Sequence, residues 1–338
     1  MAPPALNLGG RNGPLGGKPR GTDHGEFAEI YSVESSRKLH LRGAWIEDTF
    51  AEAFSMRYAR IIVTAYDAFW LTAATTAFSG YATSVIACDA EIGVEHSMNP
   101  EQTPDGRIGA AFLIFGFSEE ALAKALANRV GQCLMTCPTT AVFDGLPQVE
   151  KRIPLGKHLR YFGDGFQKSK VIDARRYWRV PVMDGEFLIE DNVGVAKGVA
   201  GGNVIIQAAD LTSALAAARR GIQAIADFPG VITPFPGGVA RSGSKVGSRY
   251  KTLKASTADA YCPTLRGRTE TKLNPEANIA QEIVIDGMDE PTVAEAMAKV
   301  IRAAVGEGVK AITAGNYGGK LGKHQIQLRE ILQGSGCG

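Results

Sequence analysis

The sequence predicts an α+β protein. Along its 338 residues, a strand–helix–strand unit followed by a second such unit can be traced twice. In each copy the helices begin at side chains that can cap them, Asp67 and Ser118 in the first copy and Asp210 and Asp289 in the second. This order is that of the split βαβ, or ferredoxin-like, motif, so we infer two such lobes from an internal duplication. The alternative is that alanine-rich helices resemble one another through composition alone.

The first lobe is expected to cover residues 43–145. Thr49-Phe50-Ala51-Glu52 fits a capping box, which predicts a short helix beginning there. Apolar β-branched runs predict the strands, and caps and glycines bound the helices. The further elements predicted in this lobe are a strand at 60–65, a helix from Asp67 to Gly80, strands at 84–87 and 111–115, a helix at 119–130 and a strand at 133–136.

Residues 146–196 are predicted to connect the lobes as antiparallel strands without a helix. Gly163-Asp164-Gly165 and Asp184-Gly185 are both typical of hairpin turns. The second lobe is expected to cover residues 197–333. Its predicted elements are a strand at 204–209, a helix at 211–227, strands at 231–233 and 283–285, a helix from Asp289 to about Gly306 and a strand at 309–313.

Residues 234–280 form a long connection inside the second lobe. The corresponding connection of the first lobe, residues 88–107, is much shorter. Loops of this length within compact domains are usually functional or disordered. We therefore expect the functional site to involve this loop.

The glycine-rich residues 1–42 and 334–338 are expected to be disordered tails. The net charge is only +2, so no strong field favours nucleic acid or a membrane surface. No apolar stretch reaches the roughly 18 residues of a membrane span, and no signal peptide is apparent. Five scattered cysteines argue against a disulfide framework. The sequence therefore predicts a cytoplasmic protein that binds neither nucleic acid nor membranes.

Common cofactor and nucleophile motifs are not found. Gly243-Ser244-Lys245-Val246 lacks the ending of a phosphate-binding P-loop, and no GxGxxG or GxSxG pattern occurs. Cys133 and Cys137 lack the spacing and partner ligands of a zinc site, so we interpret them as small core residues. These observations favour catalysis by positioning and electrostatics, with no metal.

Residues 241–254 contain five basic side chains and no acidic one. They could form a solvated surface, or a cradle in which backbone N–H groups bind an anion. A nucleic-acid-binding module would rest on this run alone. A second glycine-rich segment, residues 314–323, places Asn316 and Tyr317 beside glycines that permit close approach of a ligand, unless it is a plain turn.

Glu282 begins an apolar strand. If it faces the protein interior, loss of solvent raises its pKa. A protonated carboxyl group can donate a hydrogen bond to a developing oxyanion. The alternative is a solvent-facing glutamate at the end of a strand.

Several segments together resemble the formylmethanofuran–tetrahydromethanopterin formyltransferase family. The similarity keeps its order over about residues 43–332. It is strongest at GVITPFPGGV (230–239) and SGSKVGS (242–248). The other segments that carry it are residues 46–54, 103–107, 131–141, 162–165, 185–187, 197–203, 262–265, 282–287 and 314–319.

The resemblance implies a two-lobe α+β subunit in a homotetramer. It implies transfer of a formyl group between the amine of methanofuran and N5 of tetrahydromethanopterin, both carriers being substrates, with no tightly bound cofactor. Similar chains in some methylotrophic bacteria belong to a formyltransferase/hydrolase complex, so a partner-dependent or scaffold subunit is the alternative. The chain departs from the family pattern before residue 43, at 266–278 and at 334–338.

The family's key carboxylate corresponds to Glu282, which we assign as the catalytic hydrogen-bond donor. We expect the other residues of the site to bind the carriers. We assign the cleft walls to Phe235, Pro236, Gly237 and Gly238. Ser242, Ser244 and Lys245 are expected to contact anionic or polar groups of the carriers. Asn316 and Tyr317 are expected to complete the wall.

Overall fold

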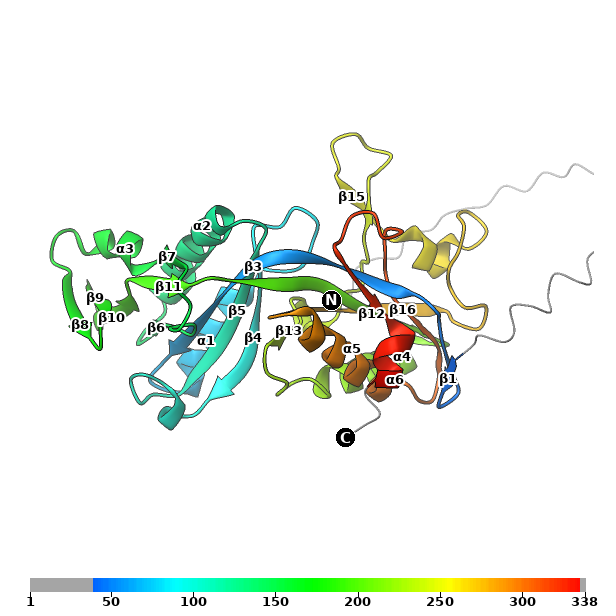
Figure 1. Ribbon diagram of the computed structural model, residues 1–338, viewed down its shortest axis with the longest axis horizontal. Helices are drawn as coiled ribbons and strands as arrows, with labels where there is room; N and C mark the ends of the chain where they lie inside the picture. Colours follow the sequence, from blue (N-terminus) through cyan, green and yellow to red (C-terminus); the bar gives the residue numbers. More distant parts are fainter. Residues whose placement is uncertain (1–38, 335–338) are drawn as a thin grey trace, which may run out of the picture. The chain divides into compact units, whose positions relative to one another are not determined.

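The computed structural model describes residues 39–334 (Figure 1). Most of both predicted tails lies outside these residues. Residues 39–42 correct the predicted boundary, because strand β1 (Leu39–Leu41) pairs antiparallel with β2 (Ala44–Ile46). Leu39 and Leu41 pack against a buried apolar cluster, which explains why the order begins before residue 43.

Six elements of the first lobe form a sheet with two helices. Asp67 and Ser118 cap the helices with their side chains, as predicted. The strands lie in the order β6-β3-β5-β4, and all neighbours are antiparallel. The elements are β3 (Phe50–Thr64), α1 (Ala68–Ser79), β4 (Glu91–Met98), β5 (Gly109–Gly116), α2 (Glu119–Arg129) and β6 (Ala141–Asp144).

The second lobe repeats this arrangement. Asp210 and Asp289 cap its two helices. The strands lie in the order β17-β12-β16-β13, again with antiparallel neighbours. In both lobes the fourth, first, third and second strands are therefore adjacent in that order. The elements are β12 (Ala196–Ala208), α4 (Leu211–Gln223), β13 (Val231–Ile232), β16 (Ile279–Gly287), α5 (Glu290–Ala304) and β17 (Val309–Thr313).

The two lobes share one continuous sheet through their longest strands. β3 and β12 pair antiparallel from Ala196 opposite Tyr58 to Ala200 opposite Phe54. Figure 1 shows these strands running side by side through both lobes. The start of β3 also pairs with β18 (His324–Gln327), which leads into α6 (Leu328–Gly334). None of the helices among residues 39–334 has the length and apolar character needed to cross a bilayer.

The connecting segment is more varied than predicted. The Asp184-Gly185 turn joins two antiparallel strands as expected. Gly163 instead ends a 3-10 helix, and Asp164-Gly165 after it joins no hairpin. Strand β10 pairs with β6 in parallel. A helical segment is also present, contrary to the prediction. The elements are β7 (Arg152–Pro154), α3 (Gly156–Leu159), the 3-10 helix Arg160–Gly163, β8 (Lys168–Ile172), β9 (Arg175–Val182), β10 (Gly185–Glu190) and β11 (Asn192–Gly194).

Three predictions in the first lobe are wrong. Residues 49–52 form no helix, because Phe50 to Ala53 pair with β18. Residues 84–87 form a loop, held by a hydrogen bond from Ser84 N to Pro234 O of the long loop at 3.2 Å. The residues near 133–136 follow helix α2 as a π-helical turn, Val130–Leu134. In the first two cases, contacts with residues distant in sequence outweigh the local signals for a cap or a strand. In the third case, the chain continues from the helix instead of forming a strand.

Candidate active site

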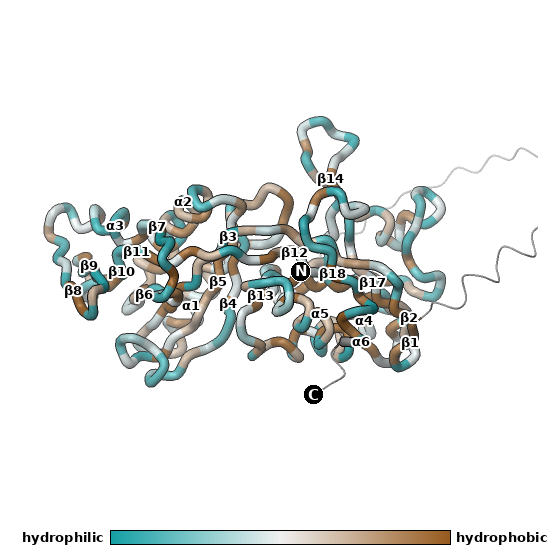
Figure 2. The backbone as a smooth tube through the Cα atoms, viewed as in Figure 1, coloured by the Kyte–Doolittle hydropathy of each residue, from teal (hydrophilic) through white to brown (hydrophobic). Residues whose placement is uncertain are grey.

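A cavity of about 740 Å³ opens beside the strands that the two lobes share. Residues of β3, β12 and β16 line it, together with residues of the long loop of the second lobe. Figure 2 shows that the part of this loop around β14 (Lys245–Val246) is largely hydrophilic. The lining includes Glu52, Phe54, Met56, residues 84–87, Glu91, Gly201, Asn203, Ile205, Phe235, residues 240–246 and 255–262, Glu282, Val284, residues 314–317 and Leu321.

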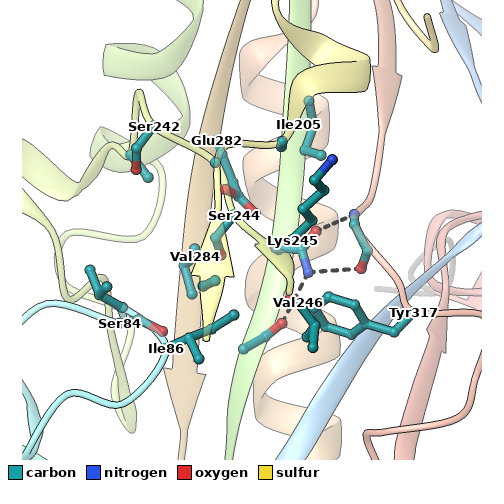
Figure 3. A pocket seen from close by; sticks show the side chains of 18 of the residues that line it. Ser84, Ile86, Ile205, Ser242, Ser244, Lys245, Val246, Glu282, Val284 and Tyr317 are labelled. Atoms are coloured by element: carbon teal, nitrogen blue, oxygen red, sulfur yellow. Dashed lines mark hydrogen bonds between the residues drawn. The ribbon is translucent and has the colours of Figure 1, made fainter. Parts of the chain in front are cut away.

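Glu282 lies at the centre of this arrangement (Figure 3). On β16 it pairs with Ile205 of β12, and it also forms a bridge with Ala240 of the long loop through N–H···O bonds of 2.8 and 3.0 Å. It is only partly exposed, and burial raises the pKa of its carboxyl group to about 7. No side chain among residues 39–334 forms a hydrogen bond with this carboxyl group. The group is therefore available to a ligand, and it is protonated in a large fraction of molecules at neutral pH.

Two tyrosines lie near Glu282. Burial raises the pKa of Tyr261 to about 12, with contributions from Glu47 and Glu282, and a hydrogen bond with Thr313 opposes the shift. Burial also raises the pKa of Tyr317, and the charge of Glu282 adds to the effect. Both phenols therefore stay neutral and can donate hydrogen bonds in the cavity. Tyr261 was not identified from the sequence, because its approach to Glu282 depends on how residues 234–280 fold.

The basic loop turns back as a short hairpin, in which β14 pairs with β15 (Ala255–Ser256). Ser242, Ser244 and Lys245 line the cavity as expected. The Lys245 ammonium lies 2.6 Å from Asp259 Oδ2, and this hydrogen bond lowers the pKa of Asp259. The basic run at residues 241–254 is therefore paired with an acidic residue, Asp259, that lies after it in the sequence. Lys245 is nevertheless about half-exposed, so its charge remains accessible to a ligand.

Asn316 and Tyr317 also line the cavity, and a buried glutamate holds their loop. Glu52 accepts hydrogen bonds from the backbone N–H groups of Tyr317 (2.7 Å), Gly319 (2.8 Å), Leu321 (2.6 Å) and Gly322 (2.6 Å). Burial raises the pKa of Glu52, but these four donors outweigh it and hold the pKa below its ordinary value. The ionised carboxylate is therefore the anchor of this wall.

The predicted wall at 235–238 is only partly found. Phe235 lines the cavity, whereas Pro236, Gly237 and Gly238 do not. These three form a 3-10 turn in which Gly237 and Gly238 have φ values of 62° and 77°. A Cβ atom at Gly238 would lie 2.5 Å from Ile222, so this glycine serves close packing of the turn.

Residues 39–334 contain no cluster of three or more histidine, cysteine, aspartate or glutamate side chains suited to a metal ion. The charged groups that line the cavity are instead the carboxyl groups of Glu52, Glu91, Asp259 and Glu282, the ammonium groups of Lys245 and Lys272, and the guanidinium of Arg241. Phenols, hydroxyls and amides accompany them. Such a set can bind polar and anionic groups and can stabilise an oxyanion.

Two family models match the chain. One, described as formylmethanofuran-tetrahydromethanopterin formyltransferase, matches residues 39–182, and the other, the proximal lobe of the same family, matches residues 185–331. A relative from Methylobacillus flagellatus named formylmethanofuran–tetrahydromethanopterin formyltransferase is 54% identical over 300 residues. The match covers 86% of this chain and 99% of the relative.

Two solved structures are also similar. The formylmethanofuran:tetrahydromethanopterin formyltransferase of Methanosarcina barkeri has a TM-score of 0.82 at 46% identity, covering 87% of this chain and all of that chain. A chain of the formyltransferase/hydrolase complex of Methylorubrum extorquens, solved with methylofuran, has a TM-score of 0.84 at 48% identity. That match covers 87% of this chain and 99% of the other.

Proposed function

The chain belongs to the formylmethanofuran–tetrahydromethanopterin formyltransferase family, and we propose that it transfers the formyl group at the cavity around Glu282. Its reaction moves a formyl group between methanofuran, or an analogue, and N5 of tetrahydromethanopterin. The observation that carries the choice of site is a carboxyl group with a raised pKa and no hydrogen-bond partner among residues 39–334, facing a cavity beside both lobes.

The transfer needs no nucleophile from the protein. The nitrogen lone pair of the accepting amine attacks the formamide carbon, and the carbonyl electrons move onto oxygen. The tetrahedral oxyanion then collapses, the bond from carbon to the donor nitrogen breaks, and a proton passes from the attacking to the leaving nitrogen. Protonated Glu282 donates a hydrogen bond to the oxyanion, and one such donor typically stabilises the transition state by about 3 kcal/mol. Holding both carriers in register supplies further acceleration.

The loop residues hold the carriers. Both carriers bear carboxylates, and tetrahydromethanopterin also bears a phosphate, which suits the half-exposed ammonium of Lys245. Ser242 and Ser244 offer hydroxyls beside it. Phe235 supplies an apolar wall, and Asn316 and Tyr317 supply a polar wall that is held in place through Glu52.

Replacing Lys245 with alanine should raise KM for one carrier about three- to fivefold, the effect of one exposed ion pair, with kcat nearly unchanged. Lys251→Ala is the matched control, because Lys251 is exposed in the same loop and does not line the cavity. Steady-state kinetics at low and high salt measure the effect, which salt should weaken. A fall in kcat with KM unchanged would instead assign Lys245 to the chemical step.

The proposal extends to the architecture and assembly. The shared strand order, fourth-first-third-second with antiparallel neighbours, supports two ferredoxin-like lobes from a duplication. We further propose a homotetramer in the cytoplasm, with the two carriers as substrates and no tightly bound cofactor. The alternative is a partner-dependent subunit, because a similar chain was solved within a formyltransferase/hydrolase complex.

The test is formyl transfer by the purified chain alone, from formyl-tetrahydromethanopterin to methanofuran, followed by the pterin absorbance. Transfer that disappears in the Glu282→Ala variant supports the proposed site. Transfer that persists in this variant assigns the chemistry elsewhere. A folded wild-type chain that transfers only after partner subunits are added supports the alternative.

A further inference from the structure

Two buried carboxyl groups meet where the lobes join. Glu91 begins β4 of the first lobe and lines the cavity, and Asp286 lies near the end of β16 of the second lobe. Their exposed fractions are 5% and 0%. The two side chains are within hydrogen-bonding reach of each other. Yet Glu91 Oε2 and Asp286 Oδ2 have no donor among the described residues, so they require a proton between them.

Within the described part of the chain, no cation neutralises this pair. Neither carboxyl group forms an ion pair with any residue of 39–334, whereas Glu95, on the same strand, is bonded to Arg60 at 2.5 and 2.7 Å. Burial raises the pKa of Asp286 well above its ordinary value, and the carboxyl group of Glu91 raises it further. Two unpaired carboxylates in contact inside a protein cannot both stay ionised, so the pair holds one proton at neutral pH.

The pair is bonded to the wall of the cavity. Asp286 Oδ1 accepts a hydrogen bond of 2.9 Å from the N–H of Gly201, which has a φ of 91° in an irregular part of β12. Asn203 continues this network: its Nδ2 donates to the carbonyl groups of Gly201 (3.1 Å) and Gly315 (3.2 Å), and its Oδ1 accepts from Gly315 N (2.6 Å). Gly201, Asn203 and Gly315 all line the cavity.

We propose that Glu91 and Asp286 are positioning residues that share one proton and join the two lobes. Through this contact they hold the part of the cavity wall formed by residues 201–203 and 315 in the geometry that formyl transfer requires. This inference rests on the proposed function and adds a proton-dependent control to the same site. Loss of the shared proton at alkaline pH places two repelling charges behind the wall and displaces it.

Two other titratable groups of the described residues, Cys88 and Asp89, lie near the pair, and neither supplies a positive charge or a proton to it. Cys88 Sγ lies 4.0 Å from Glu91 Oε1, and burial with both carboxylates nearby raises the pKa of its thiol to about 12. Asp89 is bonded to Arg129 at 2.8 Å. Cys88 thus stays neutral over the working range, and the charge of Asp89 is already compensated.

The experiment compares wild type with Asp286→Asn and Asp286→Ala between pH 6 and pH 10. Asparagine can accept the bond from Gly201 and donate to Glu91 at every pH, so it reproduces the protonated state without titrating. We expect kcat/KM of wild type to fall in the alkaline range relative to Asp286→Asn, which retains wild-type activity at neutral pH. Asp286→Ala, which loses both contacts, should be about 10- to 100-fold less active throughout.

Hydrogen–deuterium exchange at residues 201–203 and 315 gives a second readout that needs no carrier. Wild type should lose protection relative to Asp286→Asn as the pH rises, even if the chain proves inactive without partners. Parallel pH profiles for these two proteins, in exchange and in activity, would overturn the proposal. So would an Asp286→Asn protein as impaired at neutral pH as Asp286→Ala. If Asp286→Ala does not fold, the comparison of wild type with Asp286→Asn still decides.

Discussion

Replacing Glu282 with alanine is expected to lower kcat about 100- to 1000-fold, the loss that follows removal of one preorganised oxyanion donor. KM for either carrier should change little, because the hydrogen bond strengthens only as charge develops on the formyl oxygen. The carboxyl group has no other bond among residues 39–334 to lose, so the fold should tolerate the change. Initial rates at saturating concentrations of both carriers measure the effect.

Two further variants separate chemistry from packing. Glu282→Gln keeps a donor of similar size, so its kcat should lie between those of wild type and Glu282→Ala. Gln281→Ala alters the preceding residue, which also lines the cavity, and should keep most of the activity. Full activity in Glu282→Ala would remove Glu282 from the mechanism.

Replacing Glu52 with alanine is expected to destabilise the protein by about 3 kcal/mol and to raise KM about tenfold or more. The carboxylate is only 1% exposed, and its loss leaves four backbone N–H groups without their acceptor. The loop that carries Asn316 and Tyr317 would then move away from the cavity. Denaturant unfolding and steady-state kinetics measure the two effects. Glu150→Ala is the control, because Glu150 is exposed and its side chain makes no hydrogen bond or ion pair within residues 39–334.

The sign of the Glu52 effect can be checked with pH. Because its folded-state pKa is lowered, its stabilising contribution is present above the ordinary value of 4.5 and is lost as the pH falls through the folded-state pKa. The difference in unfolding free energy between wild type and Glu52→Ala should therefore shrink in acid. A difference that stays constant down to low pH would show that the four N–H bonds are not what stabilises the loop.

The helices were predictable because their signals are local. Four of the five predicted caps, at Asp67, Ser118, Asp210 and Asp289, accept a backbone N–H bond in the first turn of a helix. The fifth, Thr49, begins no helix. The predictions of strands at 84–87 and 133–136 were wrong, because a short apolar run does not show whether another strand is available to pair with it. Val85 and Ile86 line the cavity instead of joining a sheet.

Residues that line the cavity were predictable where they lie in a glycine-rich segment. Ser242, Ser244, Lys245, Asn316 and Tyr317 were named from such segments, whereas Glu282 was named from the resemblance to the family. All six line one cavity. Glu52, Tyr261 and the Glu91–Asp286 pair were missed, because each acts through residues far away in the sequence. Glu52 even favoured the wrong structure, since its place after Thr49 suggested a helix cap while its carboxylate binds a loop some 265 residues later.

The most direct test of a protonated Glu282 as the donor is the pH dependence of kcat/KM for wild type divided by that for Glu282→Gln. Ionisations of the carriers cancel in this ratio, and kcat/KM reports the pKa of the free enzyme. The ratio should be constant in acid and fall about tenfold per pH unit above the pKa of about 7. A ratio that rises through neutral pH would mean that the carboxylate is the active form, and that Glu282 acts as a base.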